Sequence, residues 1–281
     1  MKRLLSLLGL APFAVYVLFF LAVPTALAVA SGFTDDRGFT LANLQVLTAP
    51  ATLSAFTASI WVSVITALVG ALVGAILCWA LAALPESGPL RRVVDAASSV
   101  LAQFGGVMLA FAFVATIGIQ GLITVTLRER LGVDIYADGV WLYELPGLIL
   151  PYVYFQVPLM VITFLPAVVA LKPGWAEAVA TLGGSSFSYW WRVGLPVLAP
   201  AFLGSLLLLF ANAFSSYATA AALISQGAQI VPLQIRAALI GETGGSNSAT
   251  AGVLALGMIV VMTVVMLAYG RLMARAGRWQ R

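Results

Sequence analysis

The sequence contains no histidine, one cysteine and two lysines among its 281 residues. Without histidine the chain cannot build a Ser–His–Asp triad or an HExxH zinc site, because both depend on an imidazole. The one thiol, Cys78, allows no intrachain disulfide and is not a metal site by itself, so we expect it to be a small packing residue. Neither Lys2 nor Lys172 follows a glycine, which excludes a G-x-x-x-x-G-K-[ST] phosphate-binding loop. We therefore expect a non-catalytic chain without a cofactor or a metal, and any ATP that drives it must bind to another subunit.

Charged residues are also scarce, at 9% of the chain, whereas soluble domains carry about 25%. Hydrophobic residues make up 62%, and the mean hydropathy is +1.06. Apolar runs of the roughly 20 residues that a bilayer crossing needs lie at about 7–30, 55–84, 93–117, 147–171, 197–223 and 249–272. Each backbone polar group in hydrocarbon needs an internal partner, so these runs are expected to be helices, and the short alternating segments of a β-barrel are not present. The predicted fold class is an all-α integral membrane protein with six transmembrane helices.

No Asp, Glu, Lys or Arg lies near the middle of any of these runs. The nearest is Asp95, close to the start of the third run and beside Arg91 and Arg92. Proton-coupled carriers usually need an ionisable group inside the membrane. The absence of one argues against that class of transporter.

The basic residues are divided unequally between the segments that join the runs. With a cytoplasmic N-terminus, the inside segments hold ten of the fourteen, namely Lys2, Arg3, Arg91, Arg92, Lys172, Arg192, Arg271, Arg275, Arg278 and Arg281. The outside segments hold Arg37, Arg128, Arg130 and Arg236. The positive-inside rule therefore predicts that both termini are cytoplasmic. The sequence pI of about 9.5 reflects this topology, and no basic tract indicates nucleic-acid binding.

The N-terminus imitates a secretory signal peptide, with Lys2 and Arg3 before an apolar run and an Ala-Leu-Ala sequence at 26–28. However, the run from Leu4 to Ala30 is much longer than the 7–15 residues typical of a signal core. We expect an uncleaved first transmembrane helix.

A polar interruption between the fourth and fifth runs, EAVATLGGSSFSYWWRVGLP at 177–196, carries a spaced motif. It begins Glu177-Ala178-Val179, reaches Gly183 after three residues, and ends nine residues later in V-G-L-P at 193–196. This resembles the cytoplasmic EAA loop of binding-protein-dependent ABC importer permeases, whose pattern is roughly E-A-A, three residues, G, nine residues, I-x-L-P. Here Val179 and Val193 replace Ala and Ile. The resemblance covers about residues 55–275 and implies a core there, an extra N-terminal helix and outside segment at 1–54, and a cytoplasmic tail at 276–281.

In that family the loop projects into a groove on an ATPase subunit and transmits its closure. The resemblance implies ATPase coupling by Glu177, Ala178, Val179, Leu182, Gly183, Leu195 and Pro196. It also implies partners: ATP-binding subunits (two are expected), a second permease subunit, homologous or identical, and an extracytoplasmic solute-binding protein. The location that it implies is the bacterial cytoplasmic membrane. The alternative is an interfacial loop that lies on lipid.

The loop's residues predict two short helices. Trp175, Val179 and Leu182 form one apolar stripe of a helix that begins close to Glu177, where a carboxylate complements the helix dipole. Gly183-Gly184 ends this helix, and a second runs from Ser186 to about Arg192. Pro196 is expected to break the chain before the fifth run.

Polar side chains within the apolar runs are candidates for lining a translocation path. They are Gln103 in the third run, Tyr152, Gln156 and Thr163 in the fourth, and Asn212, Ser216 and Thr219 in the fifth. Such groups turn away from lipid, toward a cavity or another helix. The alternative is that they only join helices by hydrogen bonds. The G-x-x-x-G at Gly70 and Gly74 indicates a helix-packing contact rather than a site.

The predicted function is the permease subunit of an ATP-driven importer. A polyamine is the first expected substrate, followed by phosphonate, iron or thiamine, although no acid lies near the middle of a run to attract a cation. The outside segment 120–146 is a candidate docking surface for a binding protein. The other functions that stay open are an ATP-independent carrier or channel and a membrane scaffold.

Overall fold

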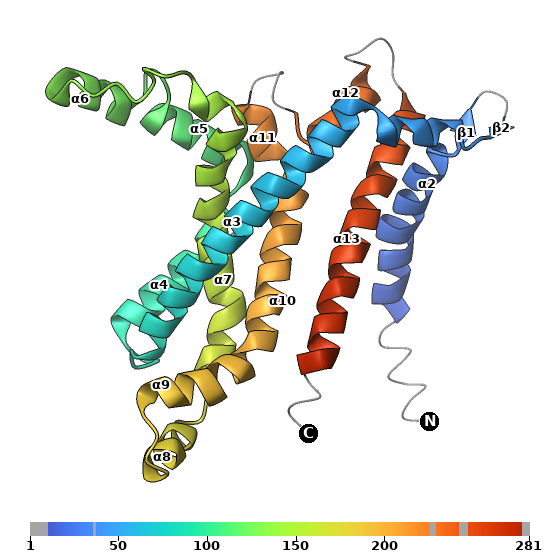
Figure 1. Ribbon diagram of the computed structural model, residues 1–281. Coiled ribbons are helices and arrows are strands. Elements are labelled where there is room, and N and C mark those ends of the chain that lie inside the picture. The colour runs from blue at the N-terminus through green and yellow to red at the C-terminus, as the bar shows by residue number, and fades with distance from the viewer. Residues whose placement is uncertain (1–10, 36–37, 225–228, 242–246, 277–281) are drawn as a thin grey trace, which may run out of the picture. The chain divides into compact units, whose positions relative to one another are not determined.

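The structure is a computed structural model that describes residues 11–35, 38–224, 229–241 and 247–276. Six helical segments in this part of the chain are long and apolar enough to cross a membrane (Figure 1). They are Ala11–Ser31, Pro50–Ala82, Gly106–Leu131, Leu145–Val169, Ser186–Phe214 and Ser248–Arg271. The prediction of an all-helical protein with six membrane-spanning helices is confirmed. The terminal basic residues at 2, 3, 278 and 281 lie outside the described residues.

Internal contacts divide the chain into two compact units, 1–56 with 230–263 and 57–229 with 264–281. The first unit contains η1 (Leu18–Ala22), α2 (Val23–Ser31), β1 (Thr34–Asp35), β2 (Gly38–Phe39), η2 (Ala42–Thr48) and α12 (Val231–Ile240). Helices α3 (Pro50–Ala82) and α13 (Ser248–Ala276) contribute to both units. The sequence-based division at 54/55 and 275/276 stays a prediction.

The first unit packs around a small apolar cluster. Ala55, Val231 and Leu254 are buried together, which joins the first turns of α3 to α12 and α13. The backbones of α2 and α13 also come close, because a Cβ on Gly252 would lie 2.4 Å from the carbonyl oxygen of Ala28. The strands β1 and β2 form an antiparallel pair.

The second unit holds the loop and the polar faces that the sequence singled out. Its further elements are α4 (Pro89–Leu101), α5 (Gly106–Ile117), α6 (Leu122–Leu131), η3 (Trp141–Tyr143), η4 (Leu145–Leu148), α7 (Ile149–Val169), α8 (Pro173–Thr181), α9 (Ser186–Tyr189), η5 (Trp190–Gly194), α10 (Leu195–Phe214) and α11 (Ala218–Leu223). Helix α7 packs against α4, α5 and α10, and it is uninterrupted although Pro158 and Pro166 lie inside it.

The expected third run, 93–117, is not one helix. An irregular segment at 102–105 divides it into α4 and α5, and the apolar helical segment of spanning length is 106–131 instead. Both halves nevertheless remain in contact with α7. Helix α4 packs on α7, Gly105 lies 3.8 Å from the ring of Phe155, and the rings of Phe113 and Tyr154 meet edge to face at 6.1 Å.

The G-x-x-x-G of α3 is a packing contact, as predicted. A Cβ on Gly70 would lie 2.8 Å from the Cβ of Gln156, and one on Gly74 would lie 2.5 Å from the Cβ of Met160. Cys78 continues this face and is fully buried, with its Sγ 4.0 Å from two carbonyl oxygens of α7. The backbones of α3 and α7 therefore approach closely over about two turns.

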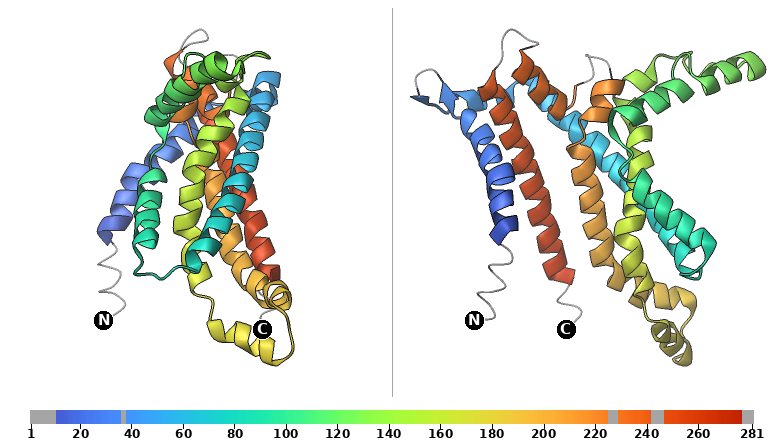
Figure 2. Two further views of the ribbon diagram at one scale, coloured as in Figure 1. Left: turned by 90° about the vertical axis from the view of Figure 1, so that its left-hand side faces the viewer. Right: turned by 180° about the vertical axis from the view of Figure 1, so that it is seen from behind.

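The second unit has two distinct ends (Figure 2). Helices α5, α6 and α11 lie at one end, which we call the α6 end. Helices α8 and α9 lie at the other, with the connection between α3 and α4, and we call it the α8 end. The elements that carry Arg91, Arg92, Lys172 and Arg192 meet at the α8 end, whereas Arg128 and Arg130 belong to the α6 end. The unequal division of basic residues along the sequence is thus also a division in space.

Candidate functional site

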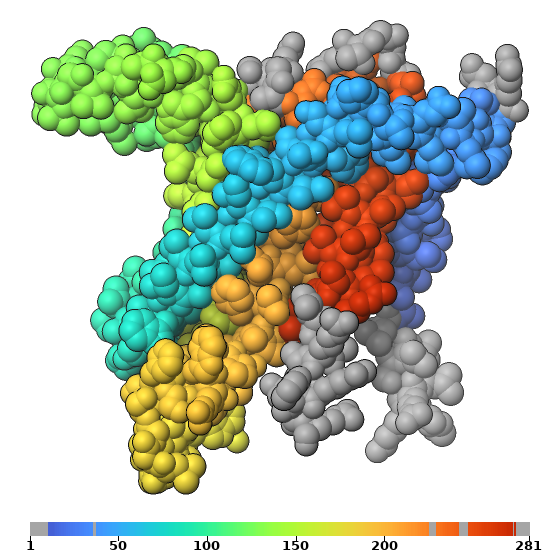
Figure 3. All heavy atoms as spheres, viewed as in Figure 1, coloured from blue at the N-terminus to red at the C-terminus, as the bar shows by residue number. Residues whose placement is uncertain are grey.

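The EAA-like loop forms two short helices that extend beyond the neighbouring helices of the second unit (Figure 3). Helix α8 begins with Pro173 after an extended Lys172, a position where the missing amide hydrogen of proline costs nothing. Helix α9 begins after Ser185, whose Oγ accepts a hydrogen bond from the Ser188 amide at 3.3 Å. Both predicted helical segments are present and begin at local caps, but the second does not end near Arg192, because it continues through η5 into α10.

The two glycines between these helices have different roles. Gly183 has φ +76°, the left-handed conformation that ends a helix at low cost only in glycine. Gly184 donates its amide to the Val179 oxygen at 2.8 Å, and Gly183 donates to the Ala180 oxygen at 3.0 Å, which together form a Schellman motif. A Cβ on Gly184 would lie 2.5 Å from a methyl group of Val179. Gly184 is therefore as restricted as Gly183, which the motif pattern alone does not show.

The outer surface of the loop is apolar and accessible. Glu177 and Ala178 are exposed, Val179 is half-buried, and Leu182 is 88% exposed. The rings of Phe187 and Trp191 stack at 6.3 Å, and both remain mostly exposed. Sequence reasoning did not include this ring pair among the site residues, although its i, i+4 spacing was visible.

Two details of the predicted loop are wrong. Helix α8 starts at Pro173, so Glu177 lies in the second turn and not in the first, where the helix dipole acts most strongly. Pro196 does not break the chain, because the helix continues from Ser186 to Phe214. The π-helical turn η5 bonds the Leu195 amide to the Trp190 oxygen, five residues back, and this shift in register places Pro196 in the first turn of α10, where no amide donor is needed.

A second candidate site forms where two helical segments are interrupted. Residues 102–105 separate α4 from α5, and residues 215–217 separate α10 from α11. Helices α5 and α11 pack against each other, and Gly106 begins α5 with φ +77°. We call the contact of these interruptions the break cluster; it consists of Gly105, Gly106, Tyr152, Ser216 and Thr219.

Three hydrogen bonds hold the break cluster together. The Gly106 amide donates to Thr219 Oγ1 at 2.9 Å, and this hydroxyl donates to the Gly106 oxygen at 3.2 Å. The Tyr152 hydroxyl donates to the Ser216 oxygen at 3.0 Å. Tyr152 and Thr219 are fully buried. Thr219 binds the Gly106 amide, which has no helical partner at the start of α5, and Tyr152 binds a carbonyl oxygen of the second interruption. Interrupted helices that meet inside a bundle are a recurrent way to build a transporter site.

The remaining path candidates separate into two kinds. The first kind has hydrogen-bond partners. Gln156 is fully buried, and its Nε2 donates to Thr66 Oγ1 of α3 at 3.0 Å. The Thr163 hydroxyl donates within its own helix, to the Leu159 oxygen. Gln103 is exposed, Asn212 is half-buried, and neither side chain has a hydrogen-bond partner among the described residues. The geometry of Gln156 thus supports the alternative of a contact between helices.

The segment 120–146 at the α6 end is folded back by aromatic contacts. The Tyr136 hydroxyl donates to the Ile117 oxygen at 2.5 Å, and its ring stacks on Trp141, whose Nε1 donates to the Ile135 oxygen at 3.0 Å. Burial, and then the neighbouring Tyr143, raise the pKa of Tyr136, so this phenol keeps the proton that it donates. The segment is an ordered surface rather than an open loop.

Comparison with known proteins identifies related sequences, although no protein-family model matches the chain. The probable sulfate transport system permease protein cysT of Chlorokybus atmophyticus is 24% identical over 202 residues, which cover 71% of this chain and 66% of that protein. The protein of the same description from Nephroselmis olivacea is 28% identical over 186 residues, or 62% of this chain and 58% of that protein. The matches span less than two thirds of the length of these relatives.

Solved structures share the fold over nearly the whole chain. A bacterial alginate ABC transporter in complex with an alginate pentasaccharide-bound periplasmic protein matches with a TM-score of 0.75 and 16% identity, covering 98% of this chain and 95% of that one. A bacterial ABC transporter involved in the import of the acidic polysaccharide alginate gives a TM-score of 0.75 at 17% identity and covers 98% and 96%. The MetNI methionine ABC transporter matches with a TM-score of 0.53 at 16% identity, and the match covers 81% of this chain and 99% of that one. At these identities the likeness shows the fold alone.

Proposed function

We propose that this chain, whose sequence relatives and fold are those of type I ABC importer permeases, forms part of the translocation path of an ATP-driven importer and couples it to a separate ATPase subunit. The observation that carries this proposal is the α8–α9 loop. It combines the spaced E-A-V…G…L-P motif with an accessible apolar surface at Leu182, Phe187 and Trp191. A loop of this shape suits a groove on a soluble partner, and the chain itself lacks a phosphate-binding loop.

The topology and partners follow from this assignment. The α8 end faces the cytoplasm and the α6 end faces outside, in agreement with the division of basic residues. Two ATP-binding subunits dock at the α8 end, a second permease subunit completes the path, and a solute-binding protein docks at the α6 end, where segment 120–146 offers a surface. The membrane is the bacterial cytoplasmic membrane, and ATP hydrolysis takes place in the partner subunits.

We propose an anion of the sulfate type as the substrate. The relatives are named as sulfate permeases, and one structural neighbour imports an acidic polysaccharide. No Asp or Glu lies near the middle of an apolar run, so no carboxylate is placed to repel an anion there. The earlier expectation of a polyamine, phosphonate, iron or thiamine is not supported by these relatives.

Transport by the reconstituted complex tests this function. Proteoliposomes that hold the permease, its ATPase and its solute-binding protein are expected to accumulate radiolabelled sulfate only when ATP reaches the ATPase. Excess unlabelled sulfate should compete, whereas spermidine should not. Uptake without ATP would support a carrier or channel instead, and ATP-dependent uptake of spermidine but not of sulfate would contradict the proposed substrate.

The path candidates are expected to respond in two ways. Gln103→Ala and Asn212→Ala should alter the rate or affinity of uptake at an unchanged melting temperature, because neither side chain has a described partner to lose. Gln156→Ala and Thr219→Val should lower the melting temperature, since the first removes one buried hydrogen bond and the second removes two. Each such bond is worth about 0.6 kcal/mol and at most about 1.7 kcal/mol. Altered uptake with unchanged melting in Gln156→Ala would place Gln156 in the path.

A further inference from the structure

A cavity of about 360 Å³ lies between α4 and α7 at the α8 end. One side of its lining is polar and comes from Glu86, Arg91, Asp95, Ser98 and Ser99. The other side is apolar and comes from α7 between Val161 and Val169. The cavity belongs neither to the α8–α9 loop nor to the break cluster, and a ligand that fills it must itself have a polar end and an apolar end.

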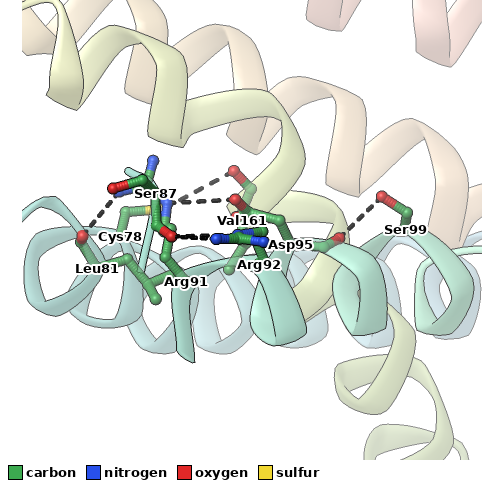
Figure 4. Close-up of polar contacts among 8 residues, drawn as sticks. All are labelled: Cys78, Leu81, Ser87, Arg91, Arg92, Asp95, Ser99 and Val161. Atoms are coloured by element: carbon green, nitrogen blue, oxygen red, sulfur yellow. Dashed lines mark hydrogen bonds and ion pairs between the residues drawn. The ribbon is translucent and has the colours of Figure 1, made fainter. Parts of the chain in front are cut away.

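The polar side is organised by a buried guanidinium (Figure 4). Only 7% of Arg91 is exposed, its Nη1 donates to the Leu81 oxygen at 2.8 Å, and its Nε donates to Asp95 Oδ2 at 3.3 Å. A guanidinium has five N–H donors, so three remain without a partner among the described residues. A buried cation that is only partly paired is costly, and an acceptor with negative charge in the cavity relieves that cost.

A simple anion is a poor occupant, because two carboxylates share the same lining. Glu86 makes no hydrogen bond or ion pair with a described residue, and Asp95 uses one carboxylate oxygen for Arg91. An anion placed beside Arg91 would therefore meet two like charges. A ligand that carries a phosphate together with an ammonium group satisfies all three side chains.

The position of the cavity favours a lipid over a soluble molecule. Glu86 lies in the turn between the end of α3 at Ala82 and the start of α4 at Pro89, where a spanning helix ends. Helix α4 is strongly amphipathic, and its exposed face presents Leu90 and Val93, at 59% and 64% exposure. Apolar groups on the accessible face of a helix at a span end are suited to contact with acyl chains.

We propose that this cavity binds a phosphatidylethanolamine-type lipid. The phosphate accepts hydrogen bonds from the free N–H groups of Arg91. The ammonium group pairs with Glu86 and with the free oxygen of Asp95, and an acyl chain lies along the apolar side of α7. The bound lipid fixes the connection between α3 and α4 against α7 at the α8 end.

Native mass spectrometry of the purified chain with added lipid tests this assignment. The unaltered protein is expected to retain phosphatidylethanolamine in preference to phosphatidylglycerol, which has the phosphate but no ammonium group. Arg91→Gln should weaken retention at least about tenfold, the equivalent of one charge-assisted hydrogen bond. The matched control is Arg92→Gln, which removes the same charge at the neighbouring position. The Arg92 side chain binds the Ser87 oxygen and does not line the cavity.

A second variant covers the case in which Arg91→Gln does not fold. Glu86 is exposed and carries no described contact, so Glu86→Gln should fold normally and reduce the preference for phosphatidylethanolamine over phosphatidylglycerol. Equal retention of the two lipids by the unaltered protein would overturn the proposal, as would equal losses in Arg91→Gln and Arg92→Gln. Displacement of the lipid by free phosphoethanolamine at the same concentration would show a site for a soluble zwitterion instead.

Discussion

Glu177→Lys and Gly183→Asp are each expected to abolish ATP-driven uptake while the protein still inserts into the membrane in normal amounts. Neither residue contributes to a spanning helix, and both side-chain positions face open space, since Glu177 is exposed and a Cβ on Gly183 would meet nothing within 4 Å. The spanning helices therefore tolerate both changes, although an Asp at the positive φ of Gly183 strains the end of α8. Docking on the ATPase does not tolerate them, because a reversed or added charge at that contact costs about 2–5 kcal/mol of binding free energy, or roughly 30-fold or more in affinity.

The measurements are uptake and substrate-stimulated ATP hydrolysis in reconstituted complexes. Gly174→Asp serves as the matched control, because Gly174 lies on the same helix, also faces open space and lacks a positive φ. It adds the same charge outside the spaced motif and near the start of α8, where the helix dipole favours a carboxylate. It is expected to retain most of the uptake. Normal stimulated hydrolysis in both Glu177→Lys and Gly183→Asp would exclude the proposed role of the loop.

Gly74→Val is expected to prevent the second unit from folding stably. The new Cβ would lie 2.5 Å from the Cβ and 2.7 Å from the Cγ of Met160, and the Val157 oxygen lies 3.1 Å away. Two Cβ atoms cannot approach each other to 2.5 Å, so α3 and α7 must move apart along their shared face. Overpacking of this kind costs about 1–3 kcal/mol, and the separation would also strain the buried hydrogen bond from Gln156 to Thr66.

Melting of the detergent-solubilised protein, followed with its yield on size exclusion, measures this effect. Gly270→Val is the control, because it places the same side chain on an apolar helix where a Cβ would meet nothing within 4 Å. The control should melt like the unaltered protein, and Gly74→Val should melt far lower or fail to accumulate. Equal melting of the two variants would mean that α3 and α7 do not pack through this glycine.

The sequence predicts well those features that short-range chemistry determines. Six spans follow from hydropathy, because every backbone group in hydrocarbon must bond within its own helix. The helix that ends at Gly183 follows from the Gly-Gly pair, because a Schellman cap involves only residues a few positions apart. The G-x-x-x-G contact of α3 follows from the small size of glycine.

Features that depend on distant residues were not predicted. The apolar run 93–117 gives no sign that it is interrupted, apart from the pair Gly105-Gly106, because the partner that holds Gly106 is Thr219, 113 residues away. From the sequence, Gln156 and Asn212 were equally good candidates for lining a path. They differ in the structure because Gln156 has a hydrogen-bond partner in Thr66 of α3. Arg91 appeared to be an ordinary basic residue at a span end, and its burial depends on how α4 meets α7.

Cross-linking from position 182 tests most directly whether the α8–α9 loop docks on an ATPase in the cytoplasm. Leu182→Cys in a Cys78→Ser background places a single thiol on the most exposed large apolar residue of the loop, since Leu182 is 88% exposed. In intact cells that thiol is predicted to cross-link to an ATP-binding subunit and to stay unlabelled by a maleimide that cannot cross the membrane, whereas Asp134→Cys at the α6 end is labelled. Labelling of position 182 from outside, without any cross-link to an ATPase, would contradict the account.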